Sequence, residues 1–221
     1  TLEPYQLDRI LTKVETTFDL SNCVEFCVEA GRPDSITRQK LETLKRHAVT
    51  RISINPQTMK EETLALIGRR HTVEQVKQAY QLAREIGFTN INMDIILGLP
   101  DETGEDVRNT LEQLKEMAPD NLTVHSLAMK RAARLNTQKE SFADKKSINS
   151  EAIVEMTASY AKEMGMEPYY LYRQKNMTGN MENVGYAVPG KEGIYNILIM
   201  EELQTIVGAG AGATTKAVFG N

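Results

Sequence analysis

The chain has 221 residues, of which 41% are hydrophobic, 25% charged and 6% aromatic, and its net charge is −4. This composition excludes a disordered, collagen-like or coiled-coil protein, and the charge gives no general attraction to nucleic acid or to an anionic membrane. No apolar stretch approaches the roughly 20 residues of a membrane helix, and residues 1–4 do not begin a signal peptide. Two cysteines cannot build a disulfide framework. We therefore expect a soluble, cytoplasmic protein with reduced thiols.

Helices and strands are predicted to alternate up to residue 126. The chain opens with an amphipathic helix over 4–18, because Leu7, Ile10, Leu11 and Val14 recur at helical spacing. Four β-type runs follow at 23–29, 51–57, 90–97 and 121–126. The segments between them predict helices over about 38–47, from a capping box at Thr58 and Glu61 to Ile67, from a second capping box at Thr72 and Gln75 to Gly87, and over about 105–117.

The pattern changes after residue 126. A polar stretch over 130–146 precedes a helix over about 149–164, a tyrosine-rich strand at 169–172, a loop over 176–190, a strand at 195–200 and a Gly-Ala run at 208–213. We therefore assign residues 1–130 to a barrel domain and residues 131–221 to a smaller α+β extension.

All four β-type runs alternate between apolar and polar residues, as where Ile52 and Ile54 oppose Arg51 and Ser53. Strand–helix alternation predicts a parallel sheet, either an open doubly wound sheet or a (β/α) barrel. Strands covered by helices on both faces would be apolar throughout. The alternation favours an incomplete barrel with helices outside and a polar ligand inside, and the alternative is an α/β sheet with one wet face.

Polar residues lie at or near the C-terminal ends of the four runs, where such folds place their chemistry: Glu29, Gln57, Asp94 and His125. Asp94 is bracketed by isoleucines and methionine, so its carboxylate needs a partner or a ligand. The alternatives are a structural cap for Asp94 and a hydrogen-bonded core position for His125.

Other patterns carry less chemistry. Cys23 and Cys27 are two thiols without a third cysteine, so they predict no metal site, and His47 and His71 are interpreted as surface or capping residues. The run at 208–213 lacks the G-x-G-x-x-G spacing and indicates close backbone approach. A basic cluster follows the fourth strand and is either a solvated loop or a receptor for a carboxylate-rich substrate: Lys130, Arg131 and Arg134.

Five ordered segments carry a family resemblance: Gly31-Arg-Pro, Arg51-Ile-Ser-Ile-Asn-Pro-Gln57, Ile67-Gly-Arg-Arg-His-Thr72, Asn92-Met-Asp-Ile-Ile-Leu-Gly-Leu-Pro100 and Leu122-Thr-Val-His-Ser-Leu-Ala-Met-Lys-Arg131. With these segments the chain resembles the oxygen-independent coproporphyrinogen III oxidases, which are radical SAM proteins, and in particular their HemZ-type branch. The resemblance implies a partial (β/α)6 barrel that binds S-adenosylmethionine (SAM) beside a [4Fe–4S] cluster reduced by an electron donor. It also implies oxidative decarboxylation of the propionates of a porphyrinogen substrate to vinyl groups.

The resemblance also implies roles for single residues. Its SAM-contacting positions fall on Glu29, Gln57, Arg69, Asp94 and Ala128. The basic cluster at 130–134 is expected to hold the substrate carboxylates. The family's C-x3-C-x2-C cluster motif and its Gly-Gly-Thr-Pro-Thr segment are absent, so we expect the chain to be an inactive fragment that lacks the first two barrel strands. A haem or porphyrin carrier on the same barrel is the alternative, although Tyr195-Asn-Ile-Leu-Ile-Met stands where the haem-chaperone branch has a His-Asn-x-x-Tyr-Trp motif.

Overall fold

Six strands form one sheet in the order β1-β2-β3-β4-β6-β5 in a computed structural model that describes residues 2–127, 150–172 and 182–219. The strands are β1 (Cys27–Gly31), β2 (Arg51–Ile54), β3 (Ile91–Leu97), β4 (Asn121–Ser126), β5 (Glu167–Tyr172) and β6 (Asn183–Ala187). The first four are parallel, and β6 pairs antiparallel with both β4 and β5. The predicted parallel sheet of four strands is confirmed.

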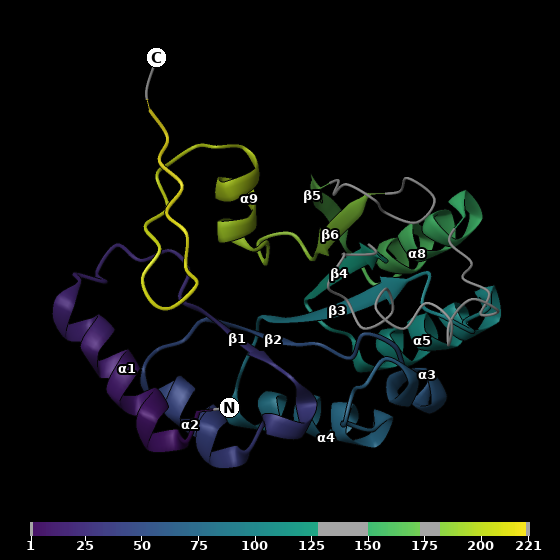
Figure 1. Cartoon of the computed structure of the whole chain (residues 1–221), viewed down its shortest axis with the longest axis horizontal. Coiled ribbons are helices and arrows are strands. Elements are labelled where there is room, and N and C mark those ends of the chain that lie inside the picture. Colours follow the sequence, from purple (N-terminus) through teal and green to yellow (C-terminus); the bar gives the residue numbers. More distant parts are fainter. Residues whose placement is uncertain (1, 128–149, 173–181, 220–221) are drawn as a thin grey trace.

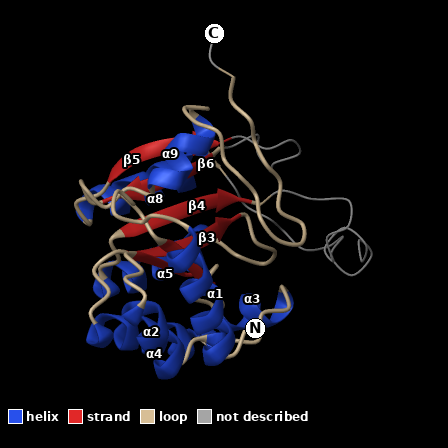
Figure 2. Cartoon of the chain, turned by 90° about the vertical axis from the view of Figure 1, so that its left-hand side faces the viewer, coloured by secondary structure: helices blue, strands red, loops and turns tan. Residues whose placement is uncertain are grey.

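With one exception, the described helices lie on one face of this sheet (Figures 1 and 2). The helices are α1 (Pro4–Thr17), η1 (Pro33–Ser35), α2 (Arg38–Arg46), α3 (Glu61–Leu66), α4 (Val73–Ile86), α5 (Gly104–Met117), α8 (Glu151–Glu163) and α9 (Ile194–Met200). Figure 1 shows α9 and the segment after it, in which Ile206 pairs antiparallel with Lys216, on the opposite side of the sheet from α2, α4 and α5. The result is half of a barrel with an outer helical layer.

The alternation of the strands sorts their side chains between the two faces. Ile52, Ile91, Met93 and Leu122 are fully buried in the hydrophobic core under the outer helices. The opposite face carries the polar residues of the same strands, and we call it the lumen face. The edge at which β1–β4 end is called the rim, and the edge at which they begin is called the floor.

Two cap predictions have different outcomes. The capping box at Thr72 and Gln75 is present at the start of α4, and Gly87 ends that helix in the left-handed region as predicted. The capping box at Thr58 is wrong: α3 begins at Glu61 after Lys60, because the Thr58 hydroxyl donates instead to the buried carboxylate of Glu102.

The first strand is shorter than predicted. It begins at Cys27, so Cys23 and Val24 lie in the preceding loop, and Val24 is 80% exposed instead of packing with Val28.

The C-terminal region differs most from prediction. Residues 195–200 lie in helix α9, where a strand was predicted, because the carboxylate of Glu25 accepts hydrogen bonds from the first backbone amides, those of Ile194 and Tyr195. Strand β6 was not predicted. The close approach predicted for the run at 208–213 is confirmed at Gly208, where a Cβ would lie 2.7 Å from the carbonyl carbon of Thr214. It is wrong at Gly210 and Gly212, where no atom lies within 4 Å of a Cβ.

In the part of the chain that the structure describes, no helix is both long enough and apolar enough to cross a membrane. The boundary proposed at residue 130 lies outside the described residues and stays a prediction.

Candidate functional site

Polar side chains on the lumen face form a hydrogen-bonded row across the strands. The Ser53 hydroxyl on β2 donates to the carboxylate of Glu29 on β1. On the next strands, the Asn92 amide accepts from the hydroxyl of Thr123 at 2.9 Å and donates to the Asp94 carboxylate at 2.6 Å. The row therefore fixes both carboxylates at the rim while leaving each with oxygen lone pairs for a ligand.

Gln57 lies beside Asp94 at the rim. Its backbone N–H donates to the Asp94 carbonyl at 2.9 Å, and its carbonyl accepts from the N–H of Ile96 at 2.9 Å. These bonds hold Gln57 at a φ of +71°, which is uncommon for a residue with a side chain. The residue is buried, and its side-chain amide forms no hydrogen bond within the described residues. Such an amide is available for a ligand.

His125 faces the other side of Asp94. The distance from its Nε2 to the Asp94 Oδ2 is 3.7 Å, and its ring is about one-third exposed. His125 is therefore a rim residue rather than a core histidine.

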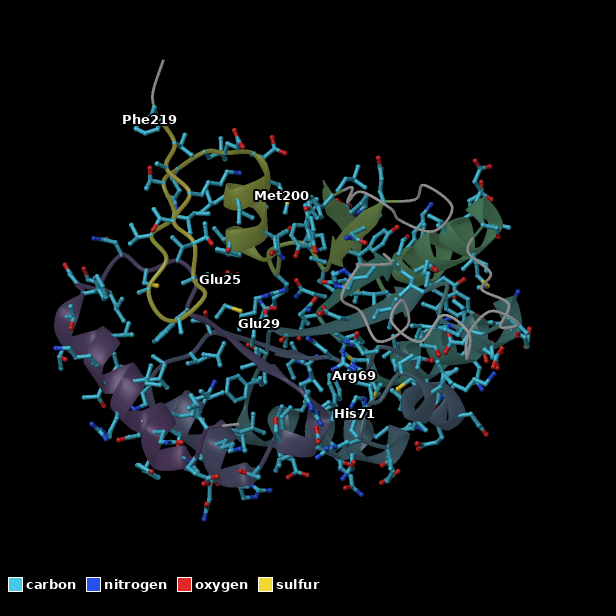
Figure 3. All side chains as sticks on the ribbon, in the orientation of Figure 1. Glu25, Glu29, Arg69, His71, Met200 and Phe219 are labelled. Carbon is cyan, nitrogen blue, oxygen red and sulfur yellow. The ribbon has the colours of Figure 1, made fainter. Side chains whose placement is uncertain are left out.

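Arg69 follows α3 and supplies positive charge near the same edge (Figure 3). Burial lowers the pKa of Arg69, the neighbouring guanidinium of Arg32 adds to this, and the carboxylates of Asp34 and Asp94 oppose it. Within the described ranges, the Arg69 guanidinium has no hydrogen bond or ion pair, whereas Arg32 is bound to both oxygens of Asp34. Arg69 is therefore a half-buried cation whose N–H groups can donate to a ligand carboxylate.

The floor is closed by packed polar residues. Arg51 is 4% exposed, and its guanidinium lies 3.4 Å from the sulfur of Cys27 and 3.5 Å from the amide oxygen of Asn121. A Cβ at Gly193, just before α9, would lie 3.2 Å from the Arg51 guanidinium carbon. Burial raises the pKa of the Cys27 thiol, although Arg51 opposes this, so Cys27 is a protonated structural thiol.

Tyr170 on β5 completes the lumen wall. A Cβ at Gly185 of β6 would lie 1.9 Å from its ring, so the ring lies flat over that glycine. Burial raises the pKa of Tyr170 to about 12, the neighbouring Tyr169 adds to this, and a hydrogen bond with Thr123 opposes it. Tyr170 is therefore a neutral hydroxyl facing the row of polar residues.

The rim thus combines two carboxylates with an amide and a guanidinium that have no hydrogen-bond partner among the described residues. Carboxylates and amides accept hydrogen bonds from an ammonium group or from sugar hydroxyls, and a guanidinium pairs with a carboxylate. A small zwitterionic or nucleoside-containing molecule fits this donor set. The described residues contain no group of three or more His, Cys, Asp or Glu side chains that could hold a metal ion.

The structure places four of the five predicted SAM-contacting residues: Glu29, Gln57, Arg69 and Asp94. Ala128 lies outside the described residues, as does the predicted substrate cluster of Lys130, Arg131 and Arg134. The interpretation of His71 as a surface residue is wrong, because its exposed fraction is 2%. His47 does lie at the C-terminal cap of α2, but its ring is buried between carboxylates rather than exposed.

The sequence pattern put Ser53 and Asn92 on the polar strand face but did not single them out as site residues, and it missed Tyr170 entirely. The polar positions of the alternating strands contained the signal for Ser53 and Asn92. No local signal identified Tyr170, since its position depends on the pairing of β5 with β6.

Comparison with known proteins identifies the superfamily. The family model of the radical SAM superfamily matches residues 6–114, which include β1–β3 and all four described rim residues. The chain belongs to the radical SAM superfamily. Members of this superfamily use SAM together with a [4Fe–4S] cluster.

Among curated radical SAM relatives, the chain is 46% identical to the oxygen-independent coproporphyrinogen-III oxidase-like protein HemZ of Bacillus subtilis, over 96% of the chain and 43% of that protein. It is 30% identical to the heme chaperone HemW of Lactococcus lactis, over 96% of the chain and 53% of HemW. The chain thus spans about half the length of the curated relatives it matches.

A solved structure supports the fold. Coproporphyrinogen III oxidase (HemN) from Escherichia coli, a radical SAM enzyme, superposes with a TM-score of 0.71 and 25% identity over 98% of this chain and 46% of HemN. The predicted α/β fold, a partial (β/α)6 radical SAM barrel, is confirmed.

Proposed function

We propose that the protein carrying this chain is a radical SAM oxidoreductase of porphyrin and haem biosynthesis, which decarboxylates the propionates of coproporphyrinogen III to vinyl groups. The observation that carries the proposal is the polar edge where Glu29 on β1, Gln57 after β2 and Asp94 on β3 come from adjacent strands. There the Arg69 guanidinium has no partner among the described residues. The similarity to HemZ over 96% of the chain supports the same reaction class.

The rim residues fit SAM group by group. The carboxylates of Glu29 and Asp94 would accept hydrogen bonds from the ammonium group and the ribose hydroxyls, and the Gln57 amide would bind the same polar edge. Arg69 would pair with the SAM carboxylate. Bound SAM supplies the radical chemistry of the superfamily, and this chain's residues bind and orient it.

The two cysteines of the chain do not form a site for a [4Fe–4S] cluster in the described structure. Cys23 is exposed in a loop and Cys27 contacts Arg51, so the two thiols occupy different environments. The described residues therefore contain no ligand set for a [4Fe–4S] cluster, and no step of the reaction is derived through one.

The substrate site is proposed on the segment that follows β4. Lys130, Arg131 and Arg134 come four to eight residues after Ser126, the last residue of that strand. A porphyrinogen bears several carboxylates, and cations near the rim would orient one propionate towards bound SAM.

An assay of the full protein that carries this chain tests the proposal. Anaerobic turnover of coproporphyrinogen III should release CO2 and form vinyl groups. Replacing Lys130 and Arg131 together by alanine should raise KM for this substrate about fivefold to thirtyfold, since each exposed pairing contributes up to about 1 kcal/mol. Substrate-independent SAM cleavage should stay unchanged. Unchanged KM would reject the substrate role, and an equal loss of SAM cleavage would assign the segment to barrel support.

A haem or porphyrin carrier is the second candidate, and the 30% identity to a heme chaperone over 96% of the chain favours it. The two functions differ in one measurement. A carrier would bind haem tightly without decarboxylating coproporphyrinogen III, whereas the proposed oxidoreductase would turn this substrate over.

A further inference from the structure

The turn after β2 is held at several points by different parts of the fold. The Asn55 N–H donates to the Gly31 carbonyl at the end of β1 at 2.8 Å. Two bonds join the backbone of Gln57 to β3, and the Met59 N–H donates to the hydroxyl of Thr110 on α5 at 3.1 Å. None of these contacts involves the carbonyl of Pro56, which accepts no backbone hydrogen bond among the described residues and needs a partner from elsewhere.

His71 makes that contact. Its Nε2 lies 3.1 Å from the carbonyl oxygen of Pro56, and the residue is 2% exposed. A carbonyl only accepts, so Nε2 carries the proton, and Nδ1 is the unprotonated nitrogen, which is buried and has no partner among the described residues. The imidazole is thus a neutral donor that points at the peptide linking Pro56 to Gln57.

We propose that His71 is a positioning residue, which holds the Pro56–Gln57 peptide in its strained conformation so that the Gln57 amide stays at the SAM-binding rim. The proposal rests on the proposed function of Gln57 as a SAM contact. A left-handed backbone at a non-glycine residue persists only where its surroundings over-determine it, and among the described residues His71 supplies the side-chain donor to this peptide.

The hydrogen bond from His71 to Pro56 also affects the position of Arg69. Arg69 precedes His71 by two residues in the short connection between α3 and α4, and Figure 3 shows the two labelled residues close together. Anchoring His71 on Pro56 therefore also anchors the backbone that carries the Arg69 guanidinium. His71 would therefore fix the positions of Gln57 and Arg69 relative to each other.

Charges around His71 favour its neutral form. Burial lowers the pKa of His71, and the cations of Arg69 and Arg32 lower it further, against the hydrogen bond to Pro56 and the carboxylate of Asp34. A neutral ring keeps the single proton on Nε2 at physiological pH, as the positioning role requires.

Two variants separate the hydrogen bond from the volume of the side chain. His71→Leu fills the space without a donor, whereas His71→Gln keeps an N–H donor at the position of Nε2. His47→Gln is the control, because His47 is also a buried histidine but bridges α1 and α2 instead of contacting the turn. The first readout is hydrogen exchange of the Gln57 backbone N–H, called Gln57 amide exchange. The second is calorimetric SAM titration, with Gln57→Ala titrated in parallel.

We expect His71→Leu to speed Gln57 amide exchange about threefold to tenfold and to weaken SAM binding by a similar factor, as for the loss of one neutral hydrogen bond. His71→Gln should restore both to within about twofold, and His47→Gln should change neither. Wild-type exchange at Gln57 in His71→Leu would overturn the positioning role, as would a failure of His71→Gln to restore it. If Gln57→Ala alone left SAM affinity unchanged, the proposed function would fail, while the exchange data would still decide the role of His71.

Discussion

Glu102 is a buried acid that the proposed chemistry does not use. It is 4% exposed and accepts a hydrogen bond from Thr58 beneath the turn that carries Gln57. Burial raises the pKa of Glu102, although the hydroxyls of Thr58 and Thr63 oppose this. The folded protein therefore holds the Glu102 proton more tightly than the unfolded chain does.

The raised pKa of Glu102 determines how the stability of the folded protein should change with pH. A raised folded pKa gives stability that is fully present below the unfolded value of about 4.5 and is lost as pH rises through the folded pKa. Glu102→Gln keeps an acceptor for Thr58 and cannot ionise. We expect the urea midpoint of this variant to fall less than that of the wild type between pH 5 and pH 8. Parallel curves for the two proteins would show that Glu102 does not titrate in this range.

Single residues at the rim were predicted where a strand pattern exposed them. Glu29 and Asp94 stand at polar positions of alternating strands, so their face followed from the period of two. His71 could not be found in this way, since its role depends on a contact with Pro56 fifteen residues earlier. Burial of a histidine by tertiary packing leaves no periodic signal in the local sequence.

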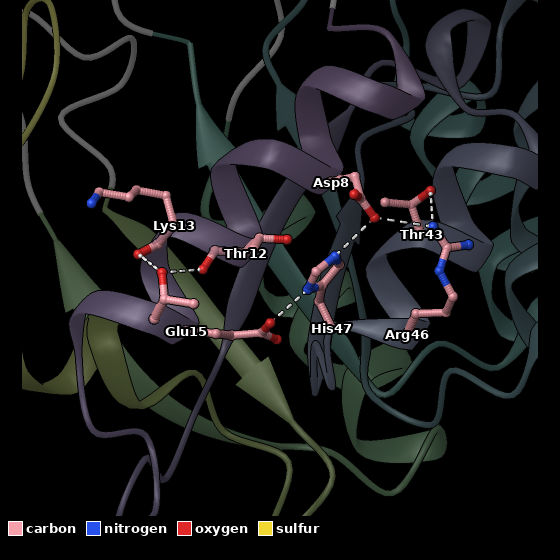
Figure 4. Close-up of polar contacts among 8 residues, drawn as sticks. Asp8, Thr12, Lys13, Glu15, Thr43, Arg46 and His47 are labelled. Atoms are coloured by element: carbon pink, nitrogen blue, oxygen red, sulfur yellow. Dashed lines mark hydrogen bonds and ion pairs between the residues drawn. The ribbon is translucent and has the colours of Figure 1, made fainter.

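At the level of helices, His47 fastens α1 to α2 (Figure 4). Its Nδ1 lies 2.8 Å from a carboxylate oxygen of Glu15, and its Nε2 lies 3.1 Å from one of Asp8. Burial acts to lower the pKa of His47, but the two carboxylates outweigh it and raise the pKa above 6.5. An imidazolium can donate to both carboxylates, whereas a neutral ring can donate to one.

The contacts of His47 with Glu15 and Asp8, which join α1 to α2, should therefore weaken as pH rises. Stability from a raised histidine pKa is fully present below pH 6.5 and is lost as pH rises through the folded pKa. His47→Gln should lower the urea midpoint more at pH 6 than at pH 9, compared with the wild type at each pH. An equal loss at both values would assign the effect to packing alone.

Strand β6 depends on a glycine. Because Tyr170 lies over Gly185, the Gly185→Ala variant must displace that ring, and we expect it to lower the free energy of unfolding by about 1–3 kcal/mol. Gly104→Ala is the matched control, since no atom lies within 4 Å of a Cβ there, and it should change stability by less than about 0.5 kcal/mol. Chemical denaturation measures both variants, and wild-type stability of Gly185→Ala would show that the ring moves without cost.

Elements with strong local signals were predicted well, and those set by tertiary contacts were not. Strand β4 has the predicted bounds, and α4 carries its predicted capping box. The apolar run over 195–200 suited a strand, but it is helical in α9, where Glu25 binds the first amides from 170 residues away. An interaction over that separation cannot be deduced from the run itself.

The whole molecule is a half-barrel with a closed floor and a polar rim. Arg51 and Gly193 pack together at the floor, while the proposed SAM-binding residues lie toward the other end of the same strands. Strand–helix order and alternation predicted this architecture. The contribution of residues 128–149, which hold Ala128 and the proposed substrate cations, stays a prediction.

Calorimetric titration with SAM tests the central claim, that the rim binds the cofactor through its carboxylates. Glu29→Gln and Asp94→Asn each preserve shape and remove one negative charge. Each should weaken binding about tenfold to a hundredfold, because a hydrogen bond to a charged group contributes roughly 1.5–3 kcal/mol. Glu42→Gln, on the exposed surface of α2, should bind SAM like the wild type. Wild-type affinity in both rim variants, with the fold intact, would contradict the assignment.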